Sequence, residues 1–252
     1  MASNKDTSTY KIIHVPKTSP RLAEIVTKTR ATRLHTLETD PTSWLSNHAA
    51  ESSLPISVWE RRLTSPDVTI LVCIANSSNE DGRDPETNLI HSEWAGFAAL
   101  RGPIKYEDYY VTPDMGLPIP ASPKEELRWH LYDLYTLPKH RGQGVARRLI
   151  EECVATAVRH TEGSEPTLVP STHTPEVKHA RIRLFMNPKN AWLITVYESM
   201  GFVKAGKVTL TEGFMANSMD ESIPANTRET KEMIDLWHTR FGLAMEQVVK
   251  IK

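Results

Sequence analysis

The chain has 252 residues, of which 39% are hydrophobic and 24% charged, a composition typical of a folded globular protein and not of a disordered one. Lysine and arginine number 30 and aspartate and glutamate 31, so the net charge of -1 gives no global electrostatic reason to expect a nucleic acid or an anionic membrane as partner. No stretch is apolar enough to span a bilayer, and the polar start lacks the apolar core of a secretory signal, so a cytoplasmic protein is expected.

The two cysteines, Cys73 and Cys153, each lie inside an apolar run and lack the spacing of a metal site. Buried, reduced thiols are therefore expected, and neither a disulfide framework nor structural zinc. The histidines show no metal-ligand spacing either, so no metal is expected.

Residues 10–100 alternate between strand and helix signals, set by β-branched runs and by capping residues. The predicted elements are, in chain order, a strand at 10–15, a helix opened by Ser19 and Pro20, a short helix opened by a capping box at Ser57–Glu60, and strands at 68–75 and 93–100. The polar segment between the last two strands predicts a hairpin with a long loop.

Residues 103–123 are rich in proline and tyrosine, which is typical of an excursion from the domain. Tyr106, Tyr109 and Tyr110 could form a lid over a substrate, although packing on the solvent side of a loop is the default expectation.

The second half of the chain shows clearer periodicity. A strand is predicted at 129–137, stopped by Pro138, and it is followed by a helix with the apolar face Ala146, Leu149, Ile150, Cys153, Val154 and Ala157. A strand at 181–186 comes next. The helix after it is capped by Asn187, opened by Pro188 and ended by Gly201, with the buried face Leu193, Val196, Tyr197 and Met200, and closing strands are predicted at 202–210 and 231–237.

The segment Arg141-Gly-Gln-Gly-Val-Ala146 joins a predicted strand directly to a predicted helix. The first N–H groups of such a helix lack partners within it, and Gly142 and Gly144 allow the backbone to approach a ligand closely. The amides of residues 142–146 could therefore bind phosphate oxygens, and a tight turn with a solvated basic helix start is the alternative. The dinucleotide fingerprint GxGxxG and the P-loop lysine are both absent, which disfavours those two nucleotide sites.

Two motifs in the second half resemble one known family. Leu134–Ala146 is similar to the acetyl-CoA-binding segment of the GCN5-related N-acetyltransferases (GNAT), whose pattern of Arg or Gln, two residues, Gly, one residue, Gly or Ala is met by Arg141, Gly144 and Ala146. Further along the chain, Asn190–Phe202 resembles that family's Asn, a seven-residue step to Tyr, and a Gly-Phe ending. Order and spacing agree in both motifs.

The resemblance implies a mixed α/β (α+β) fold with one central, twisted, mostly antiparallel sheet flanked by helices. The sheet would splay between two parallel strands, here Leu131–Leu137 and Arg181–Met186, so that acetyl-CoA lies between them. A single domain over residues 1–252 is expected, with its core at about 10–240. Three loop insertions, at 76–92, 103–128 and 161–178, are where the choice of acceptor could differ.

The same resemblance assigns the cofactor contacts. Backbone groups at the end of the first parallel strand would hold the pantetheine, residues 141–147 the pyrophosphate, and an asparagine before the second helix the cofactor arm. The residues so assigned are Leu134, Tyr135, Thr136, Arg141, Gly142, Gln143, Gly144, Val145, Ala146, Arg147 and Asn190.

Acyl transfer from a thioester to an amine needs a neutral nitrogen, a stabilised oxyanion and a proton for the leaving thiolate. Tyr197 matches the family tyrosine and is the candidate general acid, although it also continues an apolar helix face and could simply pack. A backbone N–H near Leu134 or Tyr135 is the candidate oxyanion donor.

The general base is left open. His130 and Asp133 are candidates that strand alternation places on opposite faces, so at most one points at the acceptor. Glu93 is a third candidate. A water relay from a distant carboxylate, or an amine that arrives neutral, needs no adjacent base.

Together these features predict an acetyl-CoA-dependent N-acetyltransferase that acts by direct attack in a ternary complex with a primary amine. A small-molecule amine is favoured as acceptor. The alternatives are a protein N-terminus or lysine as acceptor, a longer acyl-CoA as donor, and a non-catalytic acyl-CoA-binding regulatory protein. A homodimer through the closing strands or the segment 241–252 is conceivable.

Overall fold

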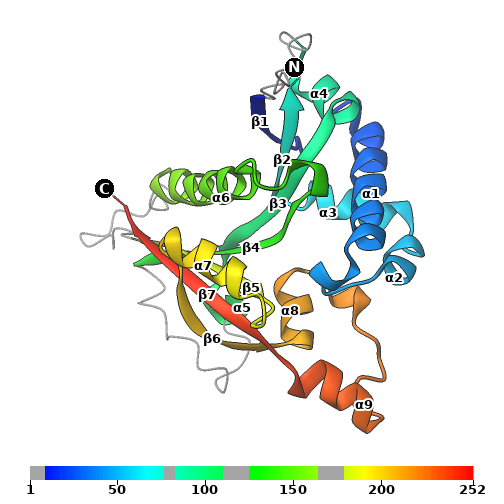
Figure 1. Ribbon diagram of the computed structural model, residues 1–252, viewed down its shortest axis with the longest axis vertical. Helices are drawn as coiled ribbons and strands as arrows, with labels where there is room; N and C mark the ends of the chain where they lie inside the picture. Colours follow the sequence, from blue (N-terminus) through cyan, green and yellow to red (C-terminus); the bar gives the residue numbers. More distant parts are fainter. Residues whose placement is uncertain (1–8, 77–82, 110–124, 164–178, 252) are drawn as a thin grey trace, which may run out of the picture. The chain divides into compact units, whose positions relative to one another are not determined.

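The computed structural model describes residues 9–76, 83–109, 125–163 and 179–251 (Figure 1). The elements of the first half are β1 (Thr9–His14), α1 (Leu22–Thr39), η1 (Pro41–Ser43), α2 (His48–Ser52), α3 (Ile56–Thr64), β2 (Val68–Asn76), α4 (Pro85–His91), β3 (Glu93–Ile104) and α5 (Tyr106–Tyr109). Those of the second half are β4 (Glu126–Thr136), η3 (Pro138–His140), α6 (Val145–Glu162), β5 (His179–Met186), α7 (Ala191–Ser199), β6 (Val203–Thr209), α8 (Leu210–Ala216), η4 (Asp220–Ser222), α9 (Lys231–Ile234), η5 (Asp235–Thr239) and β7 (Phe241–Lys250).

The strands form a mixed, mostly antiparallel sheet in the order β1-β2-β3-β4-β5-β7-β6, with β4 and β5 as a parallel pair. This is the fold class that the sequence predicted. The chain forms two compact units, unit 1 from Met1–Ala99 and Asp133–Cys153 and unit 2 from Leu100–Tyr132 and Val154–Lys252. Strands β3 and β4 and helix α6 each contribute residues to both units, and the expectation of a single domain stays a prediction.

Unit 1 is built on the antiparallel pair β1 and β2, whose register runs from Thr9↔Asn76 to His14↔Leu71. Its core combines side chains from strands and helices because each contributes one apolar face. The buried members are Ile13, Val15, Ile25, Val26, Trp59, Leu63, Val72, Ile74, Leu89, Trp94, Phe97 and Tyr135. Cys73 and Cys153 are also buried in this unit, as the sequence predicted, and neither is in a disulfide.

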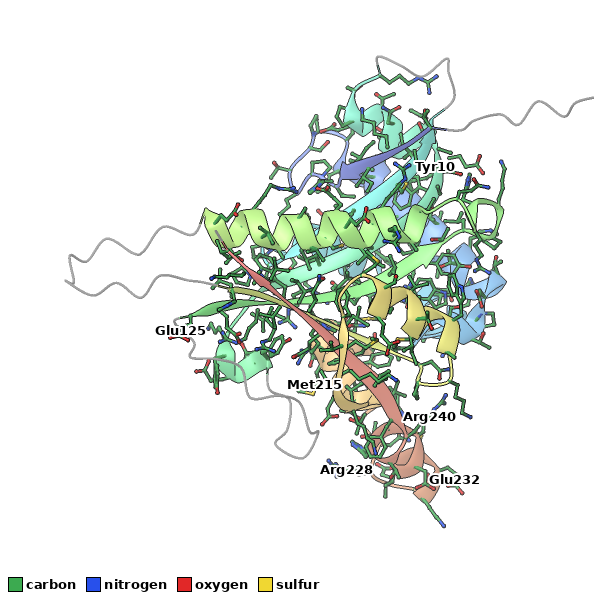
Figure 2. All side chains as sticks on the ribbon, turned by 60° about the vertical axis from the view of Figure 1, so that its left-hand side comes forward. Tyr10, Glu125, Met215, Arg228, Glu232 and Arg240 are labelled. Carbon is green, nitrogen blue, oxygen red and sulfur yellow. The ribbon has the colours of Figure 1, made fainter. Side chains whose placement is uncertain are left out.

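Unit 2 is organised around β5. This strand pairs in parallel with β4 from Glu126↔His179 to Leu131↔Leu184, and antiparallel with β7 from His179↔Lys250 to Met186↔Leu243. Strand β7 also pairs with β6, with an irregularity between Lys204 and Gly206. Farther along, Phe214, Met219 and Trp237 form a separate small apolar cluster in the segment that carries the labelled residues Met215, Arg228, Glu232 and Arg240 (Figure 2).

Unit 2 also contains a polar core. Arg181 bridges two buried carboxylates, Glu126 at 3.1 Å and Glu246 at 2.8 Å, and the Tyr109 hydroxyl donates to Glu246 at 2.8 Å. The Arg183 guanidinium lies 4.0 Å from the centroid of the Tyr109 ring and donates to the Tyr109 carbonyl oxygen. Burial raises the pKa of Tyr109 well above its ordinary value, so the hydroxyl stays protonated and can donate.

This polar core corrects the prediction for the tyrosine-rich segment. Tyr109 is fully buried, so it is neither a lid nor a residue on the solvent side of a loop. Tyr106 lies with its ring centroid 4.9 Å from the Arg128 guanidinium. Tyr110 lies outside the described residues.

The strand expected at 231–237 is wrong. Residues 231–239 are helical, as α9 and η5, and the closing strand is β7, inside the segment considered only as a dimer contact. Met233, Ile234 and Trp237 have the i, i+1, i+4 spacing of a helix, and the Thr230 side chain accepts from the Met233 N–H at 3.2 Å as a helix cap.

Several predicted helix starts are also displaced. Helix α7 begins after Asn190 and not at Pro188, because the Asn190 side chain accepts from the Leu193 N–H at 3.1 Å. Helix α3 follows Pro55 without a side-chain cap, and the capping box lies instead at Thr209 and Glu212, at the end of the predicted strand 202–210. On α7 only Tyr197 is buried, and helix α4 occupies part of the loop expected at 76–92.

Among the described residues, no helix is both long and apolar enough to cross a bilayer.

Candidate functional site

The connection from β4 to α6, in unit 1, contains two left-handed glycines. Gly142 has φ 76° and Gly144 has φ 79°, and a Cβ at either position would meet no atom of the described residues within 4 Å. The backbone conformation, and not crowding, therefore requires glycine here. Space is open above both residues, at the N-terminus of the long helix that begins at Val145. We refer to residues 141–147 as the cradle; its amides and the helix dipole favour an anion.

Arg141, the first residue of the cradle, is half exposed and is held on one side of it. Its guanidinium donates to the Asp40 carboxylate at 2.8 Å, to the Thr136 carbonyl oxygen at 3.2 Å and to the Tyr135 hydroxyl at 3.2 Å. Arg141 thus links Asp40, the C-cap residue of α1, to Tyr135 and Thr136, the last two residues of β4.

The approach to the cradle is fixed by a second polar cluster in unit 1. His140 is buried, and its ring is hydrogen-bonded to the Tyr10 hydroxyl at 3.1 Å and to Glu93 at 3.2 Å; Tyr10 is labelled on β1 in Figure 2. Glu93 also pairs with Lys139 at 2.9 Å. The hydrogen bond from Lys139 lowers the pKa of Glu93, so this third candidate base is ionised and already engaged.

Gly96 on β3 is a residue of this site that the sequence interpretation missed. A Cβ there would lie 2.6 Å from the Tyr135 carbonyl oxygen and 2.9 Å from a Val145 methyl carbon. The β3 backbone therefore approaches both the end of β4 and the first residue of α6, and the Leu137 N–H donates to the Ala95 carbonyl oxygen at 2.9 Å. A glycine inside a strand pattern was the available signal.

Strand β4 is irregular at Asp133. This non-glycine residue has φ 52°, and it follows shortly after the last parallel pair, Leu131↔Leu184. The Asp133 carboxylate accepts from Arg33 at 3.1 Å. The alternation argument that set His130 and Asp133 on opposite faces assumed an extended backbone, and it fails because Asp133 is left-handed.

His130 belongs to unit 2 and is fully buried. Its Nε2 lies 2.8 Å from the Asn217 Oδ1, and its ring packs 4.8 Å from Phe185 and 5.7 Å from Tyr132. Burial, reinforced by the charge of Arg183, lowers the pKa of His130 well below its ordinary value, so the imidazole is neutral at physiological pH.

Asn190 and Tyr197 also belong to unit 2. The Asn190 side chain caps α7, and Tyr197 is 3% exposed with its ring edge-on to Phe202 at 5.6 Å. The N–H groups of Met200 and Phe202 both donate to the Tyr197 carbonyl oxygen, which closes the helix at this residue. Trp192, on the first turn of the same helix, is 71% exposed.

A mixed sheet with a parallel β4–β5 pair, an irregular β4 and a glycine cradle opening α6 define an acyl-CoA N-acyltransferase fold. The sequence model of a protein family, the acetyltransferase (GNAT) domain, matches residues 93–204, which include the cradle, Asn190 and Tyr197. Over that segment the chain is similar to the GNAT acetyltransferases, the family that the two sequence motifs indicated.

Matches to solved structures extend over most of the chain. NAA60 of Arabidopsis thaliana in complex with a bisubstrate analogue is 14% identical, with 96% of this chain and 99% of that chain covered and a TM-score of 0.48. A putative acetyltransferase from Acinetobacter baylyi ADP1 is 13% identical, with 100% and 95% covered and a TM-score of 0.47. The ribosomal-protein-alanine N-acetyltransferase of Brucella melitensis is 15% identical, with 95% and 99% covered and a TM-score of 0.45. A comparison with curated proteins finds no match.

Proposed function

We propose that this chain is a GNAT acetyltransferase that transfers the acetyl group of acetyl-CoA to a primary amine by direct attack. The observation that carries the proposal is the cradle, where Gly142 and Gly144 are left-handed with open space above them at the start of α6. The proposed contacts are the pyrophosphate at residues 141–147, the pantetheine at the backbone of 134–136, and Asn190 near the cofactor arm. Each charge-assisted bond contributes about 1.5–3 kcal/mol, so a few suffice for tight binding.

In the proposed reaction, the amine nitrogen forms a bond to the thioester carbon and the C–S bond breaks. A backbone N–H at Leu134 or Tyr135 donates to the carbonyl oxygen as it becomes negative. Tyr197 gives its proton to the departing thiolate, and its burial at 3% exposure keeps competing water away from the hydroxyl.

The acceptor amine is proposed to lose its proton to solvent before attack. All three candidate bases have partners: His130 is hydrogen-bonded to Asn217, Asp133 is paired with Arg33, and Glu93 is paired with Lys139. The pH dependence of kcat/KM should then follow the pKa of the chosen amine, in the wild type and in His130→Gln alike. A pKa that disappears in His130→Gln would instead make His130 the base.

The acceptor is proposed to be a small-molecule amine such as a polyamine, an amino sugar or an amino acid. A protein N-terminus or a lysine side chain is the competing acceptor class. A screen that follows release of the CoA thiol with both small amines and short peptides separates the two. CoA binding without thiol release for any amine would favour a non-catalytic, acyl-CoA-binding protein.

Calorimetric titration of acetyl-CoA, and of CoA lacking the 3′-phosphate, tests the cradle. Gly144→Glu places a carboxylate in the open space and strains the left-handed backbone, and it should abolish binding because the altered backbone, the bulk and the negative charge all oppose the pyrophosphate. Gly163→Glu, which adds the same side chain beyond the far end of α6, is the matched control and should bind like the wild type. Tyr197→Phe should bind acetyl-CoA but lose about 10²–10⁴ in kcat. A folded wild type that binds no acetyl-CoA refutes the proposal.

A further inference from the structure

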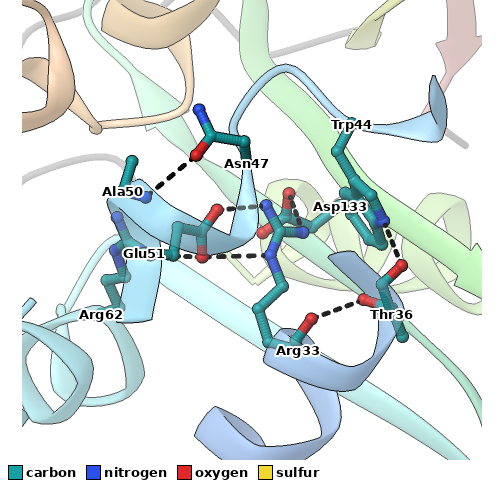
Figure 3. Close-up of polar contacts among 8 residues, drawn as sticks. All are labelled: Arg33, Thr36, Trp44, Asn47, Ala50, Glu51, Arg62 and Asp133. Carbon is teal, nitrogen blue, oxygen red and sulfur yellow. Dashed lines mark hydrogen bonds and ion pairs between the residues drawn. The ribbon is translucent and has the colours of Figure 1, made fainter. Parts of the chain in front are cut away.

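Arg33, on helix α1 in unit 1, is a buried arginine whose guanidinium is used on three sides (Figure 3). Its Nε and Nη2 donate to the two oxygens of Glu51, at 3.2 and 2.8 Å, and its Nη1 donates to Asp133 at 3.1 Å. The guanidinium also stacks on Trp44, 3.7 Å from the ring centroid. A planar fork with several donors satisfies all of these contacts at once, which a lysine ammonium does not do.

The charges around Arg33 balance within the cluster. Glu51 is fully buried and also accepts from Arg62 at 3.4 Å, so two carboxylates face two guanidinium groups. Burial opposes ionisation of Glu51, but the charge and hydrogen bond of Arg33 together with the charge of Arg62 outweigh it and lower the pKa of Glu51 below its ordinary value. The ionised Glu51 on α2 therefore holds Arg33 in place, while the remaining donor, Nη1, reaches Asp133 on β4.

That remaining donor reaches the one residue of β4 with a positive φ. Asp133 has φ 52°, a conformation that costs a non-glycine residue free energy and persists where surrounding contacts hold it. The two residues that follow are Leu134 and Tyr135, whose N–H groups are the proposed oxyanion donors. Tyr135 is itself buried and stacks on Trp44, with 5.0 Å between the ring centroids.

We propose that Arg33 is a positioning residue for acyl transfer, which holds the left-handed turn at Asp133 and so directs the following N–H groups at the thioester carbonyl. The inference rests on the proposed function. It gives Asp133 the role of an anchor for the backbone and not of a general base. Arg33 acts through Asp133 and touches no substrate.

The kinetic consequence is a loss confined to the chemical step. Arg33→Lys keeps the charge but loses the fork, so the Asp133 turn relaxes while the cradle is unchanged. We expect kcat to fall about 10- to 100-fold, as a misplaced catalytic group does, and KM for acetyl-CoA to change less than threefold. Arg30→Lys is the matched control, because Arg30 lies on the same helix and donates at 3.0 Å to the Ser52 carbonyl oxygen of α2. It should leave kcat within twofold of the wild type.

Substitutions at Asp133 separate an anchor from a base. Glycine adopts φ 52° without help and alanine does not, so Asp133→Gly should retain at least tenfold more kcat than Asp133→Ala. If Asp133 were a general base, both variants would lack the carboxylate and lose rate equally, and the pH profile would lose one pKa. Equal losses in the two variants therefore overturn the inference.

Acetyl-CoA titration of every variant fixes the fraction of active protein. A loss of rate in Arg33→Lys that disappears after correction for this fraction would make Arg33 a residue of fold stability only and overturn the inference. If Arg33→Lys does not fold, the Asp133 pair still decides the question. Failure of the wild type to bind acetyl-CoA removes the proposed function and this inference together, whereas normal binding with an unaffected kcat in Arg33→Lys refutes the inference alone.

Discussion

Gly96→Ala tests the close approach of β3 to the end of β4. The added Cβ would lie 2.6 Å from the Tyr135 carbonyl oxygen, about 0.8 Å inside ordinary van der Waals contact, and 2.9 Å from Val145. The obstacle is backbone, so no side-chain rotation relieves it. Overpacking of this kind lowers the free energy of unfolding by about 1–3 kcal/mol. Alanine also reduces the conformational entropy of the unfolded chain, which offsets less than about 1 kcal/mol of that loss.

Urea unfolding followed by the fluorescence of the 6 tryptophans measures this cost. For a chain of this size, a loss of 1–3 kcal/mol corresponds to a thermal midpoint lower by about 2–12 °C. Gly163→Ala is the control, because among the described residues a Cβ there meets only the Arg159 carbonyl oxygen, at 3.3 Å; it should stay within about 0.5 kcal/mol of the wild type. A Gly96→Ala variant as stable as that control would show that the two backbones do not approach each other as described.

Two further predictions concern buried titratable groups. Burial raises the pKa of Cys73 to about 11 and raises that of Cys153, so neither thiol should react with a disulfide reagent in the native protein and both should react in denaturant; a fast native reaction would contradict this. The lowered pKa of His130 means that below about pH 6.5 the unfolded chain binds a proton that the folded chain does not, so stability falls with decreasing pH. Between pH 7.5 and 5.5 the wild type should lose on the order of 1 kcal/mol more than His130→Gln in urea unfolding, and equal losses would refute the assignment of this slope to His130.

The parts of the site that follow from local chemistry could be predicted from the sequence. The cradle depends on glycines that take positive φ next to a helix start, and Gly142 and Gly144 do so. Helix α6 has a clear 3.6-residue apolar period, and its predicted face includes the fully buried Leu149, Ile150 and Cys153.

Features imposed by distant residues were missed. Nothing next to Asp133 in the sequence signals a left-handed residue; the turn is paired with Arg33 on another element. Strand β7 was not predicted because it lacks the alternation of a half-exposed strand: three successive residues, Ala244, Met245 and Glu246, are buried. Glu246 is buried because Arg181 and Tyr109, remote in sequence, contact it.

The division of the chain into interleaved units has a consequence for synthesis. Unit 1 needs Asp133–Cys153 as well as Met1–Ala99, so it can close only after Leu100–Tyr132 of unit 2 has already left the ribosome. Strand β4 begins in that segment, and its parallel partner β5 ends at Met186. At typical elongation rates, Met186 is synthesised about 3–10 s after Tyr132. During that interval β4 lacks its parallel partner, and the edge of Leu127–Leu131 that β5 later covers is the stretch where a chaperone or a second nascent chain would first compete with folding.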